Sequence, residues 1–258
     1  MAPPQFTDDL PGNVFLRRNG GGGGRLPGGL IDLLRTHREN YAWPFNTTPA
    51  SSQQEIINIE CAVGEYTNHL TVQAAYQIVV RVSIWARNRR HNLVVDANDH
   101  EKVVMFESIQ NLLVEEDLTE GLSKLSDAPG VSLVLATKVS RFCRTMAGAA
   151  VDRHASYFFN SLRVISDDAP ATRSTEFRRQ WVRGVDGNSR LATFTQRKFS
   201  ANLNEYAAAY LPLLREIADA LNAAGIRFMC AATGIRKTWT SSDVEMAAFY
   251  WWALNGSR

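Results

Sequence analysis

The chain has 258 residues, of which 45% are hydrophobic and 21% are charged, and its formal net charge at pH 7 is +2. This length and apolar content suit one folded domain with an ample core. So small a positive charge permits binding to nucleic acid without demanding it. Local clusters of basic residues therefore carry more information than the total charge.

The cysteine pattern narrows the chemistry and the compartment. Cys61, Cys143 and Cys230 are far apart and include no Cys-x-x-Cys pair, which argues against a disulfide framework, a zinc site and an iron–sulfur cluster. We therefore expect no metal and no other cofactor. The sequence also shows no signal peptide and no apolar run long enough to span a membrane, so we expect a cytoplasmic monomer that does not enter membranes.

Residues 1–29 are rich in glycine and proline and include an unbroken glycine run over 20–24. A phosphate-cradling loop needs a Lys-Ser/Thr pair or a preceding strand, and the sequence predicts neither here. We expect a flexible N-terminal arm, followed by a helical domain over 30–258.

Apolar residues at helical spacing predict helices through most of 30–258. A short helix over 30–40 precedes an aromatic turn at 41–45, and Thr48-Pro49 begins a second helix. Further helices are expected over about 71–88, 101–114, 118–126, 156–164, 201–224 and 241–254, with another around Lys138. Since no alternating strand pattern persists, the predicted fold class is all-α, a two-lobed helical bundle.

Residues 166–200 depart from this periodicity. They are polar and basic, and they contain Arg178, Arg179 and Trp181 among several other arginines. We expect an Arg-rich, irregular insertion. Acidic residues dilute its charge, so contact with phosphate and a solvated loop are equally compatible with the pattern.

The most informative stretch runs from residue 128 to residue 154. Ala128-Pro129-Gly130-Val131-Ser132 breaks two helical patterns like a hairpin, Lys138 lies in the helix that follows, and Val151-Asp152-Arg153-His154 begins the next helix. Taken singly, Pro-Gly is an ordinary turn and aspartate is a common helix N-cap. Their order is more specific than any one of them.

This order resembles the active-site region of the helix-hairpin-helix DNA glycosylases, over about residues 120–165. A weaker resemblance covers the last third, where a long helix precedes Ser241-Ser242-Asp243-Val244-Glu245 and a Trp-rich helix. It is to a phage and actinobacterial branch related to α-glutamyl/putrescinyl-thymine pyrophosphorylases and to glycosylases of hypermodified phage bases. The hairpin departs from the superfamily's usual Leu-Pro-Gly-Val-Gly, and the iron–sulfur cysteines of some members are absent.

The resemblance implies a catalytic role for Asp152 and a catalytic or DNA-contacting role for Lys138. A carboxylate beside the sugar stabilises the positive charge that develops as an N-glycosidic bond breaks. The lysine is either a nucleophile or a phosphate contact, and its short interval from Asp152 favours the phosphate contact. The expected contacts with DNA are made by Gly130, Ser132, Lys138, Arg141, Arg153, Arg178 and Arg179.

An enzyme of this type flips its target base out of the helix, so it needs groups that hold the base. Trp43, Phe45 and Trp181 are candidates for stacking, and Asn46 is a candidate for reading a base edge. Core packing explains most tryptophans and phenylalanines equally well, and capping explains Asn46.

The predicted function is that of a DNA glycosylase that excises a modified, hypermodified base, such as glucosylated hydroxymethylcytosine, and leaves an abasic site, in defence against phage. Two alternatives stay open. One is a non-catalytic DNA-binding module that uses the same hairpin. The other is a helical protein–protein adaptor whose Trp-rich C-terminal helix forms an interface.

Overall fold

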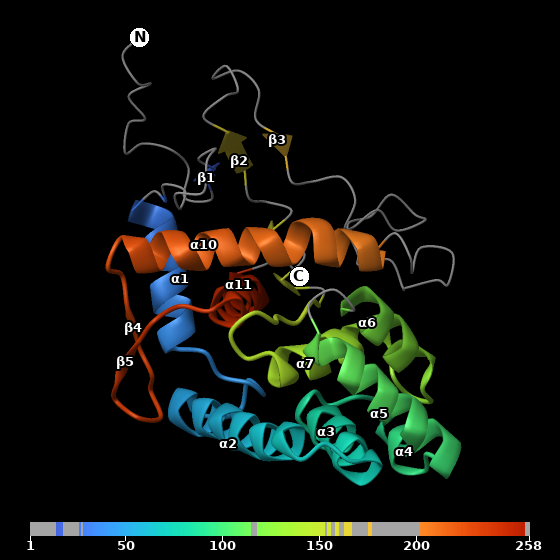
Figure 1. Cartoon of the computed structure of the whole chain (residues 1–258). Coiled ribbons are helices and arrows are strands. Elements are labelled where there is room, and N and C mark those ends of the chain that lie inside the picture. The colour runs from blue at the N-terminus through green and yellow to red at the C-terminus, as the bar shows by residue number, and fades with distance from the viewer. Residues whose placement is uncertain are drawn as a thin grey trace.

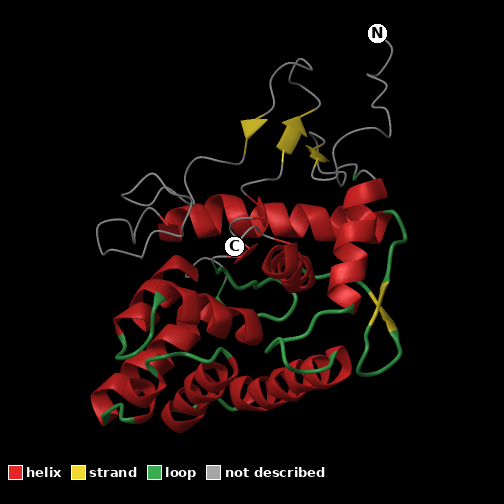
Figure 2. Ribbon diagram, turned by 180° about the vertical axis from the view of Figure 1, so that it is seen from behind, coloured by secondary structure: helices red, strands yellow, loops and turns green. Residues whose placement is uncertain are grey.

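Helices make up most of the chain that the structure describes, as the sequence predicts (Figures 1 and 2). The computed structural model describes residues 14–17, 26, 28–114, 118–152, 154, 155, 158, 159, 163–166, 175, 176 and 202–255. Within this part, no helix is both long and apolar enough to cross a membrane.

The principal helices pack into two groups. Their bounds are α1 (Gly28–Glu39), α2 (Pro49–Asn68), α3 (Val72–Trp85), α4 (His91–Val95), α5 (Asp99–Leu113), α6 (Leu118–Asp127), α7 (Leu133–Cys143), the π-helical turn η1 (Tyr206–Tyr210), α10 (Leu211–Ala223) and α11 (Ser241–Asn255). One group comprises the helices from α2 through α7, in which α5 and α6 make the most extensive contact. The other comprises α1, α10 and α11, in which α11 packs against both α1 and α10.

Side-chain caps fix where several of these helices begin. The hydroxyls of Thr48 and Thr71 accept backbone N–H bonds at the starts of α2 and α3. Asn98 and Glu101 form a reciprocal capping box at the start of α5. Such caps satisfy backbone donors that have no partner within the helix, so short polar residues ahead of an apolar run predict helix starts well.

Two small sheets were not predicted. In the first, β1 (Val14–Arg17) pairs in parallel with β2 (Arg163–Ser166), and β2 pairs antiparallel with β3 (Thr175–Glu176). In the second, β4 (Phe228–Met229) pairs antiparallel with β5 (Arg236–Lys237). The chain is therefore predominantly helical rather than purely so.

The first sheet changes three local expectations. Strand β1 lies inside the stretch predicted as a flexible arm, β2 replaces the end of the helix predicted over 156–164, and β3 lies inside the predicted irregular insertion. These strands are at most four residues long, and β1 pairs with β2 across about 150 residues of the chain. Local periodicity reveals neither so short a strand nor its distant partner.

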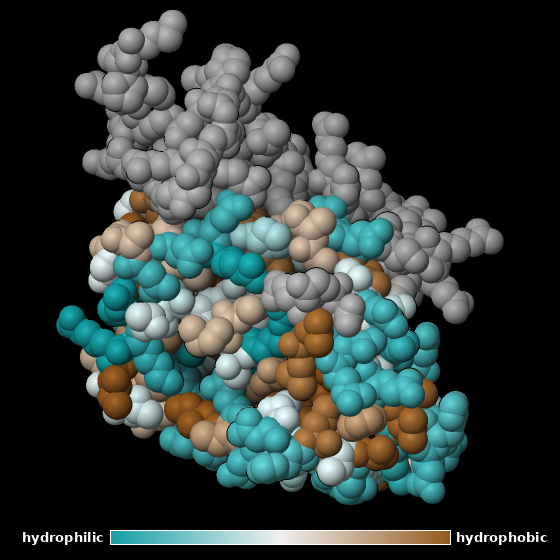
Figure 3. Space-filling model, viewed as in Figure 1, coloured by the Kyte–Doolittle hydropathy of each residue, from teal (hydrophilic) through white to brown (hydrophobic). Residues whose placement is uncertain are grey.

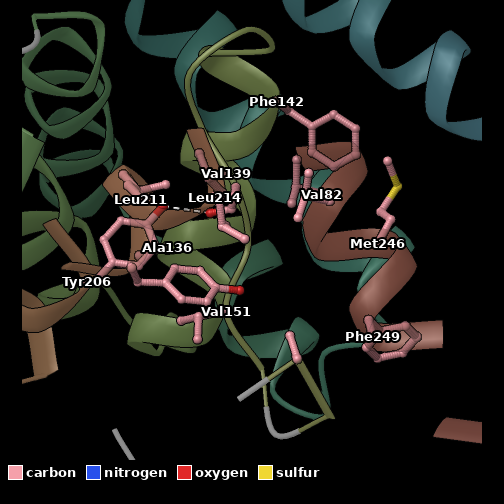
Figure 4. Close-up of a cluster of buried hydrophobic side chains, with 14 of the residues drawn as sticks. Val82, Ala136, Val139, Phe142, Val151, Tyr206, Leu211, Leu214, Met246 and Phe249 are labelled. Carbon is pink, nitrogen blue, oxygen red and sulfur yellow. Dashed lines mark hydrogen bonds between the residues drawn. The ribbon is translucent and has the colours of Figure 1, made fainter. Parts of the chain in front are cut away.

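One hydrophobic core joins the two groups, with α11 at its centre. Every residue of α11 from Ser241 to Phe249 is buried, and Figure 1 shows α11 end-on between α10 and α7. Figure 4 shows side chains from α3, α7, α10 and α11 meeting in this core. A helix buried on all sides is normally apolar on all sides, so the polar residues of α11 need an explanation.

The surface carries mixed side chains. On the face drawn in Figure 3, hydrophobic residues are interspersed with hydrophilic ones. Ile84 and Leu93, which are 58% and 50% exposed, are among the exposed apolar residues of α3 and α4. Scattered exposure of this kind is ordinary for a folded protein and identifies no partner.

Candidate functional site

The predicted hairpin between helices is present. It joins α6 to α7, and Gly130 adopts a φ of 75°, in the left-handed region that favours glycine. Ser132 caps α7 by accepting a hydrogen bond from the backbone N–H of Leu135. Gly130 and Ser132, both predicted to contact DNA, therefore lie in one tight turn at the start of α7.

This hairpin is locked to the loop between α3 and α4. The side-chain Nδ2 of Asn88 donates a hydrogen bond to the carbonyl of Gly130 over 2.9 Å. A Cβ atom at Gly130 would lie 2.6 Å from the carbonyl oxygen of Arg90. Only glycine allows this close approach of two backbones, so the Pro-Gly pair forms a specific packing contact as well as a turn.

Lys138 lies on α7 and is half-buried. Its Nζ is 5.7 Å from the centroid of the Trp85 ring, a cation–π distance. Trp85 ends α3, so Lys138 sits between the hairpin at one end of α7 and the aspartate segment that follows the other end.

Three side chains fix the segment that leads to Asp152. The hydroxyls of Tyr206 and Tyr210 donate hydrogen bonds to the carbonyls of Ala149 and Ala150, over 2.6 and 2.9 Å. The Thr137 hydroxyl of α7 accepts a hydrogen bond from the N–H of Val151 over 3.2 Å. The backbone before Asp152 is thus held from two sides.

The two tyrosines reach this segment from the π-helical turn η1. The sequence predicts one continuous helix over 201–224, but the structure has η1 directly before α10. Pro212, in the first turn of α10, has no N–H to donate to the preceding turn, and single π turns accommodate such an interruption, frequently at functional sites.

Asp152 itself caps the next helical turn. Its Oδ1 accepts a hydrogen bond from the backbone N–H of Ala155 over 2.9 Å, and the side chain stays partly exposed. The N-cap predicted from sequence is therefore confirmed. This bond and the anchored segment before it hold the carboxylate in one orientation.

The structure adds a second carboxyl group, Glu245, that the sequence analysis missed. It lies in the central helix α11 and is only 5% exposed. Burial raises the pKa of the Glu245 carboxyl to about 8, and the negative charge of Asp152 contributes to this rise. The positive charges of Arg141, Lys138 and Arg38 oppose it. A glutamate in an otherwise apolar run, Val244 to Phe249, is the sequence signal that could have identified it.

Tyr210 belongs to the same group of charges. Burial raises the pKa of its hydroxyl, and the negative charges of Glu245 and Asp152 raise it further. Tyr210 therefore stays neutral and serves as a hydrogen-bond donor to Ala150. The site brings together an oriented carboxylate, a buried carboxyl group and a lysine, from both groups of helices.

Arg141 corrects one prediction. It was expected to contact DNA, yet it is 1% exposed; its Nε donates to the Ser242 hydroxyl, and its NH2 lies 3.4 Å from Glu60. In the structure Arg141 lies on the inner face of α7, where Glu60 of α2 is its acidic partner. Its structural role is to neutralise buried charge near Glu245.

An aromatic cluster extends to the helical turn that Asp152 caps. The Trp43 indole donates to the carbonyl of Trp85 over 3.2 Å, and the Phe45 ring, 50% exposed, stacks parallel to Phe249 with centroids 6.1 Å apart. Phe249 in turn lies 5.4 Å from the ring of His154, two residues after Asp152. Trp43 and Phe45, both predicted from sequence, therefore lie in one aromatic cluster that extends to the aspartate turn.

The other predicted residues are less informative. Asn46 is exposed next to Phe45. Arg153, Arg178, Arg179 and Trp181 lie outside the described residues. Among the described residues, no group of three or more histidine, cysteine or acidic side chains is placed to hold a metal ion.

Comparison with known proteins adds no relative: no family model, no curated protein and no solved structure matches the chain. The function therefore has to be argued from the geometry of the site.

Proposed function

We propose that the protein is a DNA N-glycosylase in which Asp152 is the catalytic carboxylate. The observation that carries this proposal is the pairing of an anchored, partly exposed aspartate with a buried glutamate of strongly raised pKa. Two carboxyl groups whose environments separate their pKa values are the usual equipment for cleaving glycosidic bonds.

In this proposal Asp152 stabilises the charge that forms on the sugar. When the bond between C1′ and the base nitrogen breaks, its electron pair leaves with the base and positive charge develops on the sugar. A fixed carboxylate stabilises that charge and accepts the proton of the water that adds to C1′. The hydrogen bond from Ala155 and the anchoring by Tyr206 and Tyr210 hold Asp152 without reorganisation.

Glu245 sets the charge of the site. With a pKa of about 8 it is mostly protonated at neutral pH, so Asp152 is the main negative charge presented to the sugar. An ionised Glu245 would place a second negative charge near Asp152, and the repulsion between the two carboxylates is unfavourable. We assign Glu245 a positioning role, because it is buried in α11 and acts through Asp152.

Lys138 and Phe45 provide contacts with the substrate. Lys138, which lies over the Trp85 ring, is assigned to the DNA backbone in this proposal. Phe45 offers an exposed aromatic face, and stacking on such a face is the usual way to hold a flipped base. The partner in this proposal is DNA, and we propose that the enzyme acts as a monomer.

The test uses DNA duplexes and single strands that carry glucosylated hydroxymethylcytosine, hydroxymethyluracil, substituted thymine, 8-oxoguanine or uracil. Abasic sites are scored as alkali-labile breaks after incubation. We expect abasic sites on at least one bulky modified base, and that base would identify a role in defence against phage. Borohydride trapping in the same reactions should give no covalent adduct, because Lys138 is assigned to the backbone.

Binding to every duplex without any abasic site would contradict the proposal. It would favour a DNA-binding module that uses the α6–α7 hairpin, the second function for which the structure offers an observation. Neither binding nor cleavage would favour an adaptor.

A further inference from the structure

Three unneutralised arginines crowd the loop that is locked to the hairpin. Arg87, Arg89 and Arg90 lie between α3 and α4, and all three side chains are exposed. Among the described residues, none of these guanidinium groups has an acidic partner, whereas Arg35 and Arg38 pair with Asp32 and Asp243. Exposed cations that no carboxylate neutralises remain free to bind an external anion.

The loop is rigid. Asn88 links it together: its Nδ2 donates to Gly130 and to the Ser83 hydroxyl, and its Oδ1 accepts from the N–H of Arg90. His91 bonds the same Ser83 hydroxyl over 3.0 Å. Arg87 adopts a φ of 50°, an unusual value for a residue other than glycine. The arginines are thus presented from a fixed backbone and not from a loose tail.

Few acidic residues flank the loop and the hairpin in the sequence. Asp96 follows α4 and Asp127 ends α6 just before the hairpin, and both are exposed. Arg87, Arg89 and Arg90 outnumber them, so the surface formed by the loop and the hairpin keeps an excess of positive charge. Such a surface suits a polyanion better than an acidic side chain, which a single arginine satisfies.

We propose that the loop over 87–90, which is locked to the hairpin over 128–132, binds the phosphate backbone of DNA through Arg89 and Arg90. This inference rests on the proposed function and extends it by locating the main electrostatic contact. Arg89 and Arg90 bind successive phosphates along one strand. Trp85, two residues before Arg87, contacts Lys138 and accepts from Trp43. The buried Trp85 therefore links the arginine loop to Lys138 and to the aromatic cluster.

The experiment measures the affinity for an unmodified, fluorescein-labelled duplex by anisotropy, from 50 to 300 mM salt. It compares the wild type, the double variant Arg89→Ala/Arg90→Ala and the control Arg81→Ala. Arg81 is exposed on α3 and, like the loop arginines, has no acidic partner among the described residues. Each lost phosphate contact reduces the magnitude of the slope of log affinity against log salt by about 0.9. The slope of the double variant should therefore be shallower by about 1.8, and its affinity near 0.1 M salt should be lower on the order of 60-fold.

Arg81→Ala should retain the wild-type slope, and melting temperatures should agree among all three proteins because the changed side chains are exposed. Equal slopes for the double variant and Arg81→Ala would overturn the assignment of this surface, even if base release is observed. The same samples are assayed for base release. A shallower salt slope in the double variant, with no base released by the wild type, would support the DNA-binding surface and contradict the proposed glycosylase activity.

Discussion

At the scale of single residues, the site depends on how unlike its two carboxyl groups are. Asp152 is partly exposed and bonded to a helix N-terminus, and Glu245 is buried with a pKa of about 8. The sequence was sufficient to predict that Asp152 caps a helix, because an aspartate before a helical run is a local signal. It could not predict that Arg141 lies inside, because that depends on which face of α7 meets α11.

Glu245 makes folding stability depend on pH. Its folded-state pKa lies well above the ordinary value of 4.5, so the native state binds a proton that the unfolded state has lost. The contribution of Glu245 to stability should therefore be fully present below pH 4.5 and be lost as the pH rises towards 8. Between pH 5.5 and 7.5 the loss is about 2 to 3 kcal/mol, at about 1.4 kcal/mol per pH unit.

Urea denaturation of the wild type, Glu245→Gln and Glu55→Gln over this pH range checks the prediction. Glu245→Gln removes the titrating group and should flatten the curve, whereas Glu55, exposed on α2, should leave it unchanged. The same slope in all three proteins would contradict the buried, proton-binding Glu245.

At the scale of elements, helix starts were predictable and their interruptions were not. Thr48, Thr71 and Ser132 occupy N-caps because their hydroxyls serve backbone donors within three residues. The π turn η1 has the same apolar spacing as an ordinary helix, so only the packed structure distinguishes it. The hydrogen bonds of the two tyrosines to Ala149 and Ala150, which fix the aspartate segment, were not foreseen.

The hairpin makes a prediction at this scale. Gly130→Ala places a Cβ 2.6 Å from the carbonyl of Arg90 and forces alanine into a left-handed φ. We expect a loss of at least about 2 kcal/mol, since each such strain costs about 1 to 3 kcal/mol.

Gly64→Ala is the matched control. Gly64 lies in α2 with nothing within 4 Å of a Cβ, so alanine should stabilise the protein by about 0.5 to 1 kcal/mol. Both values come from urea denaturation at one pH. If Gly130→Ala were as stable as the wild type, the hairpin would not be locked to the α3–α4 loop.

At the scale of the whole molecule, a buried ion pair joins the first and last principal helices. Arg38 of α1 lies 2.8 Å from Asp243 of α11, with both side chains at most 10% exposed. The predominance of helix was predictable from periodicity, but this contact spans 205 residues, and the pairing of β1 with β2 also joins distant segments. No local pattern encodes such partners.

Asp243→Asn leaves the Arg38 charge buried without its counter-ion. We expect a loss of about 3 kcal/mol in the free energy of unfolding, because the buried guanidinium is left with neither a counter-ion nor water to solvate it. Asp32→Asn, which breaks the exposed Asp32–Arg35 pair, should change it by less than about 0.5 kcal/mol. Equal, small losses in both variants would show that the Arg38–Asp243 pair does not hold α1 to α11.

The central claim is that the charge of Asp152 drives the release of a base. The most direct measurement is mass-spectrometric detection of free base from the preferred modified duplex, under single-turnover conditions, with the wild type, Asp152→Asn and Asp219→Asn. Asparagine caps a helix as well as aspartate does, so Asp152→Asn keeps the hydrogen bond from Ala155 and removes only the charge. Asp219 is an exposed aspartate on α10. The account predicts release by the wild type and Asp219→Asn, and at least about a hundredfold slower release by folded Asp152→Asn; full release by Asp152→Asn would contradict it.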